Sequence, residues 1–301
     1  MEVKQTFNAE KCSWINIDTT KAHEVENLKK DLSISNEMLN YSLDKNERAR
    51  VEYDAEDEAL LVVFNVPHLT KTDNHYETSP MSFIMKDSYF ITFVNERTDY
   101  VEKIIEDLLK KDSQQTTASL LFHSLFMISD NYFPLIDEVN NQRVALNKKL
   151  RQKTTNKNLL EMSDLEIGLV YLVTATRQNT VLLEQVKAQT IYQAFNAQEK
   201  EELDDVLIEA RQAVEMTRLA SDILDQLSGT YNNLLNNNLN DTMKILTIWS
   251  LLLTIPTIVS GFFGMNMPLP FENSEAGWII SLVISLALSA WLIILLWRRI
   301  K

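Results

Sequence analysis

The sequence predicts an α/β domain followed by long helices and two membrane-spanning helices. Short segments rich in β-branched and aromatic residues are confined to roughly the first 115 residues. After Thr116, glycine and proline become scarce, which favours long uninterrupted helices. Near the C-terminal end, two uncharged apolar segments reach the length needed to cross a bilayer. We therefore expect three regions, at residues 1–115, 116–242 and 243–301.

The first region is expected to be a small cytosolic α/β domain. Four segments have the composition of strands and two have helical periodicity. The strand candidates are Cys12–Ile17, Leu60–Val66, Met81–Met85 and Tyr89–Val94, and the helix candidates are Lys21–Asp31 and Asp99–Lys110. Between the last two strands, Lys86-Asp87-Ser88 suits a hairpin turn, so these strands are expected to pair antiparallel.

The second region is expected to be helical throughout. Long helices are predicted at about 116–151 and 161–195, the latter opening with the capping-box pattern Ser163-Asp164-Leu165-Glu166. A third helix begins with the same signature at Asn196-Ala197-Gln198-Glu199, and no strong stop signal follows before Pro256. We therefore predict one helix from roughly 198 through 263, on the order of 100 Å long. A helix of that length projects as a stalk and enters a membrane.

The two apolar segments are predicted to form a membrane hairpin. The first span is expected at about Ile245–Phe263 and the second at about Trp278–Trp297, joined by residues 264–277. Lys244 precedes the first span and a basic tail at 298–301 follows the second, whereas the joining loop has no lysine or arginine. The positive-inside rule then places both termini in the cytosol and the loop outside. We expect a multi-pass protein of the cell membrane that contacts the lipid bilayer.

Composition argues against several classes of function. The formal net charge of −13 has the opposite sign to that of proteins that grip nucleic acid, so no such partner is expected. The single cysteine, Cys12, excludes a disulfide framework or thiolate zinc site within one chain, and the four histidines share no ligand spacing. We also expect no signal peptide. The chain offers no nucleophile–base pair and no phosphate-binding loop, so we do not expect an enzyme.

One face of the first span differs from the others. Steps of three or four residues from its cytosolic end pass along polar, small and hydroxyl-bearing positions, with two apolar positions among them. These positions are Asn240, Met243, Leu246, Ser250, Thr254, Thr257 and Gly261. If several copies of the helix pack around an axis, this face would line a pore. Small and hydroxyl residues also serve plain helix packing, so the pattern alone leaves both interpretations open.

The tripeptide Gly264-Met265-Asn266 directly follows the first span. Mg2+ prefers oxygen ligands and gives up its waters reluctantly, so a ring of Asn266 amide oxygens could hold those waters without stripping them. A ring of carboxylates would bind more tightly and slow release. The negative end of the helix dipole also favours a cation there. A bare three-residue match equally fits a glycine-terminated helix, and it is the position between two spans that favours an ion site.

This placement resembles the defining signature of the CorA family of magnesium channels. The resemblance extends back along Met243-Lys244-Ile245-Leu246-Thr247, then to Pro256-Thr257 and Gly261. It also covers the order of acidic α/β domain, stalk helix, two spans and basic tail. Phe263 stands where the family usually has a tyrosine, a change that removes a hydroxyl and keeps the ring.

The resemblance implies a funnel-shaped homopentamer with five stalk helices around one pore, which passes hydrated Mg2+ passively inward and takes Co2+ and Ni2+ as surrogates. The pathway residues that it implies are Gly264, Met265 and Asn266 in an outer selectivity loop, Asn240 and Thr257 as polar rings, Met243 and Leu246 as a hydrophobic gate, and Ser250, Thr254 and Gly261 on the remaining pore face. Gly229 and an asparagine-rich stretch at 232–238 stand where family members may carry an acidic pore residue.

Family members also bind regulatory Mg2+ between cytosolic domains through carboxylates. At the family's spacing from Asn266, Asp205 falls on one such position with Asp204 beside it. The acidic run from Glu199 to Asp205 is equally typical of the first turns of a helix, so a regulatory ligand and a solvated helix face both remain open. Asp87 is one of several candidates for the partner ligand.

Two other functions remain open. Zinc-selective relatives carry a different middle residue in the tripeptide, so Met265 favours Mg2+ over Zn2+. A membrane-anchored metal sensor or scaffold would assemble without conducting, and it would tolerate substitution of Asn266.

Overall fold

The computed structural model describes residues 4–20, 32–152, 154–265 and 277–300. The chain separates into two compact units, Met1–Ser228 and Gly229–Lys301, and the helix α7 (Ala197–Phe263) belongs to both. The division predicted at 115 and 242 rests on composition and stays a prediction. The expected helix Lys21–Asp31 lies outside the described residues.

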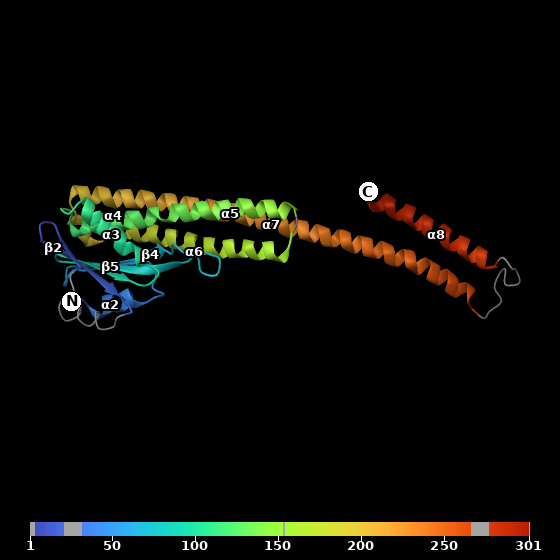
Figure 1. Ribbon diagram of the computed structural model, residues 1–301, viewed down its shortest axis with the longest axis horizontal. Coiled ribbons are helices and arrows are strands. Elements are labelled where there is room, and N and C mark those ends of the chain that lie inside the picture. The colour runs from blue at the N-terminus through green and yellow to red at the C-terminus, as the bar shows by residue number, and fades with distance from the viewer. Residues whose placement is uncertain (1–3, 21–31, 153, 266–276, 301) are drawn as a thin grey trace. The chain divides into compact units, whose positions relative to one another are not determined.

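The first unit is built on a six-stranded sheet of order β1-β2-β6-β5-β4-β3 (Figure 1). Its strands are β1 (Gln5–Phe7), β2 (Cys12–Asp18), β3 (Arg50–Asp54), β4 (Ala59–Pro67), β5 (Thr78–Lys86) and β6 (Tyr89–Val94). Neighbouring strands pair antiparallel except β2 and β6, which pair parallel in the register Ser13↔Tyr89. The first unit is therefore an α/β fold built on a mixed sheet, and the composition of this region predicts that class.

All four predicted strands are confirmed, each to within three residues at its ends. The turn between β5 and β6 is also confirmed, because Lys86 pairs with Tyr89 and leaves Asp87 and Ser88 at the bend. Asp87 has a φ of 53°, the left-handed conformation that such tight turns need. The sequence analysis missed β1 and β3. Both lie at edges of the sheet, and no residue of β3 is fully buried, so their composition lacks a strong apolar signal.

Both faces of the sheet are buried. Alternate residues of β4 point to opposite sides, so Leu60, Val62 and Phe64 join one apolar cluster and Leu61 and Val63 join another. The first cluster packs against α3 (Tyr100–Lys111), α4 (Thr117–Asp130) and the start of α7, and the second packs against α2 (Asn36–Leu43). A strand that is buried on both faces has a continuous run of apolar residues, and Leu60–Val66 shows such a run in the sequence.

The predicted helix at 116–151 is wrong as a single element. Two helices occupy this stretch, α4 (Thr117–Asp130) and α5 (Tyr132–Gln152), with Asn131 between them. Pro134 lies in the first turn of α5. The N–H groups of a first turn have no carbonyl acceptor within the helix, so proline loses no hydrogen bond there. Within a continuous helix its ring would clash with the carbonyl of Asp130, so the helix divides just before it.

The predicted start of the next helix is also wrong. The helix α6 (Asn156–Val186) begins at a cap formed by Thr155, whose side chain accepts a hydrogen bond from the N–H of Asn158 at 3.3 Å. Ser163 lies two turns inside the helix, so its capping-box pattern has no capping role. A short 3-10 helix at Thr190–Gln193 then leads toward α7.

The long helix is confirmed. The helix α7 runs unbroken for 67 residues from Ala197 to Phe263 and contains Pro256. Its predicted capping box is also present, because Asn196 Oδ1 accepts from the N–H of Glu199 at 2.9 Å while Glu199 Oε2 accepts from the N–H of Asn196 at 2.8 Å. The second unit is completed by α8 (Gly277–Ile300). Among the described residues, α7 and the stretch Gly277–Leu295 are long and apolar enough to cross a membrane.

Candidate ion pathway and cation-binding residues

The apolar part of α7 has one partly covered stripe within the second unit and is exposed elsewhere, both on the predicted pore face, here called the open face, and at apolar residues such as Trp249 and Ile258. The least exposed residues recur every three or four positions, and Val259, at 8% exposure, is the most buried of them. This stripe is Ile248, Leu252, Ile255, Val259 and Phe263. All seven positions of the predicted pore face are exposed and lie off this stripe. The side chains proposed to meet the ion are therefore not used to pack the hairpin of α7 and α8.

The hydroxyl groups of the open face share one hydrogen-bond pattern. Ser250 donates to the carbonyl of Leu246 at 2.9 Å, Thr254 donates to Ser250 at 2.8 Å, and Thr257 donates to Leu253 at 2.9 Å. Each hydroxyl has a single proton, and here the helix backbone accepts it. The oxygen lone pairs that remain point outward as acceptors. From Ser250 to Thr257 the hydroxyls of this face therefore present acceptors, which suits the water shell of a cation, whose hydrogens point away from the metal.

At the other end of the apolar segment, the predicted gate residues are strongly exposed. Met243 is 58% exposed and Leu246 is 67% exposed, although both are apolar. Asn240 lies one turn before Met243 and is also exposed. Exposed apolar side chains of this size on a helix indicate a surface that another molecule covers.

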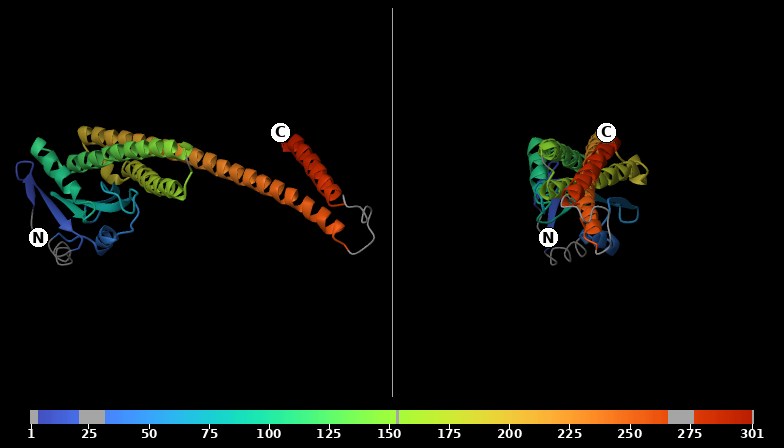
Figure 2. Two further views of the ribbon diagram at one scale, coloured as in Figure 1. Left: turned by 45° about the vertical axis from the view of Figure 1, so that its right-hand side comes forward. Right: turned by 90° about the vertical axis from the view of Figure 1, so that its right-hand side faces the viewer.

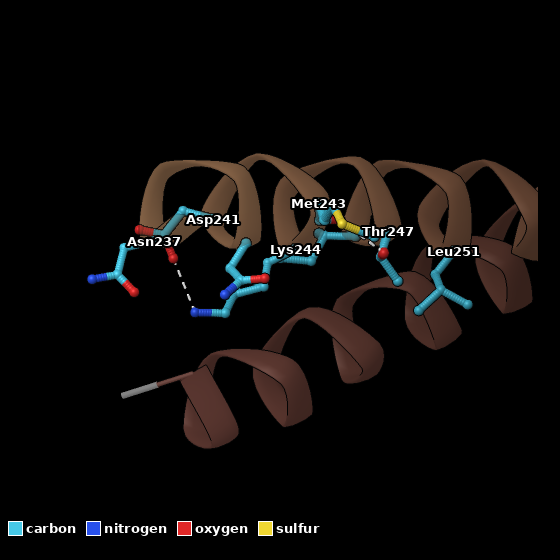
Figure 3. Close-up of a pocket in the computed structure, with 8 residues that line it drawn as sticks. Asn237, Asp241, Met243, Lys244, Thr247 and Leu251 are labelled. Carbon is cyan, nitrogen blue, oxygen red and sulfur yellow. Dashed lines mark hydrogen bonds and ion pairs between the residues drawn. The ribbon is translucent and has the colours of Figure 1, made fainter. Parts of the chain in front are cut away.

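An open pocket of about 700 Å³ lies beside this stretch of α7 (Figure 3). Its lining includes Asn240 and Met243 from the predicted pore face together with Asp241, Lys244 and Thr247. Lys244 Nζ lies 2.9 Å from Asp241 Oδ1, so the two charges at the start of the span neutralise one another. Sequence reasoning missed Asp241, a carboxylate directly beside the predicted Asn240 ring. The sequence pattern that points to Asp241 is its spacing of three residues from Lys244, which suits an ion pair on one face of a helix.

The tripeptide begins where α7 ends. The N–H of Gly264 donates to the carbonyl of Ser260 at 2.9 Å, and the N–H of Met265 donates to Phe262 at 3.4 Å. A Cβ at position 264 would lie only 3.1 Å from the Ser260 oxygen, so glycine fits the tight close of the helix. Met265 is exposed. Asn266, the proposed selectivity residue, lies outside the described residues.

The acidic run at the start of α7 divides into structural and free carboxylates. Glu199 is buried, and its carboxylate accepts from Thr116 at 2.7 Å in addition to its capping bond. Glu202 accepts from Ser119 at 2.5 Å. These two acids fasten α7 to the first turn of α4, so they are not available as ligands.

The two predicted regulatory residues differ in the same way. Asp204 forms an ion pair with Lys187 at the end of α6, whereas the exposed Asp205 has no polar contact within the described part of the chain. Among those residues, no group of three His, Cys, Asp or Glu side chains is close enough to hold a metal ion. A metal at Asp205 would therefore need ligands from elsewhere, such as a second copy of the chain.

One further carboxylate on α7 has a perturbed acidity. Burial, and secondarily the charge of Asp130, raise the pKa of Glu209 above its ordinary value. Glu209 lies one helical turn after Asp205, so the acidic side of α7 extends beyond the predicted pair. A nearby divalent cation would offset this repulsion between the carboxylates of Glu209 and Asp130.

Comparison with known proteins identifies the family. Residues 9–299 match the model of the family described as CorA-like Mg2+ transporter protein. The chain belongs to this family. A cobalt/magnesium transport protein CorA from Methanocaldococcus jannaschii is 22% identical over 91% of this chain and 87% of its own length. The CorA of the same description from Thermotoga maritima is 22% identical over 84% of this chain and 73% of its own length.

The fold agrees with a solved member of the CorA family. The complete structure of the CorA magnesium transporter from Methanocaldococcus jannaschii matches with a TM-score of 0.80 at 21% identity. The match covers 97% of this chain and 92% of that chain. The order of α/β domain, long helix and C-terminal apolar helix is therefore that of CorA proteins.

Proposed function

We propose that this chain forms a channel for the passive entry of hydrated Mg2+, with Co2+ and Ni2+ as surrogate ions. The row of outward acceptors on α7 carries this proposal. Ser250, Thr254 and Thr257 all donate to the backbone and leave only lone pairs on the open face. The alignment of these three hydroxyls on one exposed face, off the partly covered stripe, supports a lining role for them. Membership of the CorA-like Mg2+ transporter family supports the same conclusion.

The proposed pathway is assembled from five copies of α7 around one axis. The amide oxygens of Asn266, with Gly264 and Met265, form the outer selectivity loop, and Thr257, Thr254, Ser250 and Gly261 follow along the span. These groups hydrogen-bond the waters of Mg2+, which the ion gives up reluctantly. Neutral oxygens bind the hydrated ion weakly enough for it to leave, as conduction requires.

The membrane potential supplies the driving force in this proposal. With the first unit in the cytosol, a divalent cation that enters gains roughly 4.6 kcal/mol per 100 mV. No coupling to nucleotide hydrolysis is then required. The termini are proposed to be cytoplasmic and the membrane to be the cell membrane, on the distribution of Lys244 and the basic tail.

Gating is proposed to depend on Met243, Leu246 and Asp205. When cytosolic Mg2+ bridges carboxylates of neighbouring copies, the exposed apolar side chains of Met243 and Leu246 close into a dry constriction. When the ion dissociates, repulsion between acidic faces lets the helices separate and the constriction fill with water. The exposed, unpaired state of Asp205 supports its place in such a bridge, and the Lys187 pair makes Asp204 the weaker candidate.

Ion flux into vesicles that contain the purified protein tests this proposal. Mg2+, Co2+ and Zn2+ are supplied outside in turn, and Mg2+ inside is varied. The expected result is entry of Mg2+ and Co2+ that falls as internal Mg2+ rises. Flux of Zn2+ alone would show a zinc transporter. Binding of Mg2+ to the assembled protein without any flux would show a sensor or scaffold, and either result would overturn the proposal.

A further inference from the structure

The turn between α5 and α6 has a charge opposite to that of the rest of the chain. No aspartate or glutamate occurs between Glu138 and Glu161, whereas this stretch contains six lysines and arginines in a chain of net charge −13. They are Arg143, Lys148, Lys149, Arg151, Lys153 and Lys157, of which Lys153 lies outside the described residues. We call four of the described cations, Lys148, Lys149, Arg151 and Lys157, the basic turn.

The cations of the basic turn are largely not neutralised within the chain. Among the ion pairs of the described residues, Lys149 has a partner in Glu161 at 2.7 Å, and none involves Lys148, Arg151 or Lys157. All three of these residues are exposed. Helix stability explains Lys149 and Arg151, which lie in the last turn of α5 beside the negative end of its dipole.

Helix stability does not explain Lys157. This residue lies in the first turn of α6, where the helix dipole is positive and acidic side chains are favoured. The first turn of α6 contains no acidic residue. The positive end of α6 therefore repels Lys157, and an external anion would relieve that repulsion.

The geometry favours an extended anionic surface over a small bound anion. An open pocket of about 410 Å³ beside the turn is lined by Lys71, Lys149 and Lys157, but also by Glu161 and Asp164. Lys149 is neutralised by Glu161, and Lys71 lies 3.2 Å from Glu138. The pocket therefore offers little net charge to a single phosphate, whereas the exposed Lys148 and Arg151 do not line it.

The basic turn lies at the end of the first unit where α7 leaves it. Three contacts show that α6 and α7 run antiparallel: Lys187 with Asp204, Glu184 with Arg211 at 2.7 Å, and Thr176 with Thr217 at 3.1 Å. As residue numbers fall along α6 they rise along α7, so the start of α6 lies toward Ser228. Figures 1 and 2 show the turn at this end of the first unit. From the same end the chain continues into the apolar segments.

We propose that the basic turn docks on the anionic phospholipid headgroups of the membrane that α7 and α8 cross. Anionic lipids give the cytoplasmic leaflet a negative surface potential that attracts such clusters. The proposal rests on the cytosolic placement of the first unit in the proposed function. At about fivefold per cation, three unpaired cations shift the ratio of docked to undocked turns by about 100-fold. The turn thereby makes the first unit sensitive to lipid charge.

Energy transfer in lipid nanodiscs tests the docking. The full chain carries a donor dye at Gln152→Cys, in a background where the buried Cys12 is replaced by alanine, and the lipid headgroups carry the acceptor. Transfer is expected to rise when phosphatidylcholine is partly replaced by phosphatidylglycerol and to fall again in high salt. The variant K148Q/R151Q/K157Q should lose the rise.

Matched controls separate the basic turn from total charge and from free anions. The variant K103Q/K110Q/K111Q removes three exposed lysines from α3, at the other end of the first unit (Figure 1), and should keep the rise. Inorganic phosphate at constant ionic strength should not compete, because a lipid surface presents many headgroups at once. Thermal melting confirms that each variant is folded.

Three results would overturn the proposal. They are transfer independent of phosphatidylglycerol, loss of the rise in the α3 variant as well, and competition by phosphate, which would indicate a small-anion site. Transfer that depends on salt but not on lipid charge would indicate an acidic protein surface instead. Anionic lipid is present on both faces of a nanodisc and no flux is measured, so this result is independent of whether the chain conducts Mg2+.

Discussion

Two stretches of α7 use the same side-chain hydrogen bond in different surroundings. In the first unit, Thr217 is fully buried, donates to the carbonyl of Ala213 at 2.9 Å, and lies 3.1 Å from the hydroxyl oxygen of Thr176 on α6. In the second unit, Thr254 and Thr257 donate to their own backbone in the same way but remain exposed. A threonine that faces another helix therefore packs it, and a threonine that faces open space presents an acceptor.

This difference shows what a row of small and hydroxyl residues can and cannot indicate. In sequence, Thr217 and Thr257 look alike, since both occur at helical spacing among apolar residues. Only burial separates a packing role from a pathway role.

The largest effect is expected at the end of the open face, with Asn266→Ala. Removing the amide removes the oxygen proposed to hold the waters of Mg2+, so uptake into vesicles should fall to background while the assembly still elutes at its normal size. Asn46→Ala, in an exposed turn of the first unit, provides the control and should transport normally. Full transport by the Asn266 variant would refute the selectivity loop.

Thr257→Val and Thr217→Val form the most direct test of the comparison. Thr257→Val should reduce flux by about 5- to 10-fold, on the order of one lost hydrogen bond, and leave the melting temperature unchanged. Thr217→Val should lower stability by about 1 kcal/mol and leave the flux per folded channel unchanged. Flux and thermal melting are measured on both. If both substitutions act only on stability, the open face is a packing surface and the pathway is elsewhere.

The regulatory carboxylates allow a smaller test of the same kind. Asp205→Asn should weaken the inhibition of flux by internal Mg2+ because it removes an unpaired ligand. Asp204→Asn should affect inhibition much less, since its carboxylate is already paired with Lys187. That pair is solvent-exposed and its loss costs at most about 1 kcal/mol. Equal effects of the two substitutions, or none, would contradict the assignment of Asp205.

The smallest effect is a dependence of stability on pH in the first unit. Burial, and secondarily the charge of Arg97, lower the pKa of His68, while Glu77 opposes this. The unfolded chain then binds the proton more readily than the folded chain, so stability is complete above about pH 6.5 and declines as the pH falls. The melting temperature at pH 7.5, 6.5 and 5.5 measures the decline. His68→Gln should flatten it, whereas His123→Gln should retain it.

Much of the fold could be predicted because its signals are local. The unbroken α7 follows from the absence of any stop between its capping box and Phe263, and the central strands follow from their apolar runs. The failures have local causes as well. The helix predicted at 116–151 divides before Pro134, and the pattern at Ser163 predicts a cap that Thr155 forms instead.

The candidate site was harder to predict because its distinctions depend on distant partners. Glu199 and Glu202 are bound by Thr116 and Ser119, each 83 residues away in sequence, so the sequence could not tell them from Asp205. The spacing of residues in one chain does not determine the number of subunits, so the expected pentamer rests on family resemblance alone. The pore face was easier to predict, because its periodicity lies within a single helix.

The unbroken course of α7 links two of the proposed sites. Between Asp205 and Met243 lie about 57 Å of continuous helix at about 1.5 Å per residue, so the proposed regulatory and gate residues belong to one element. Gly229 lies between these residues, and glycine in a helix interior is less stable than alanine by about 1 kcal/mol. No atom lies within 4 Å of where a Cβ would stand there, so packing does not require the glycine. Gly229 thus lowers the local stability of α7 between the two proposed sites, at a position where packing does not demand glycine.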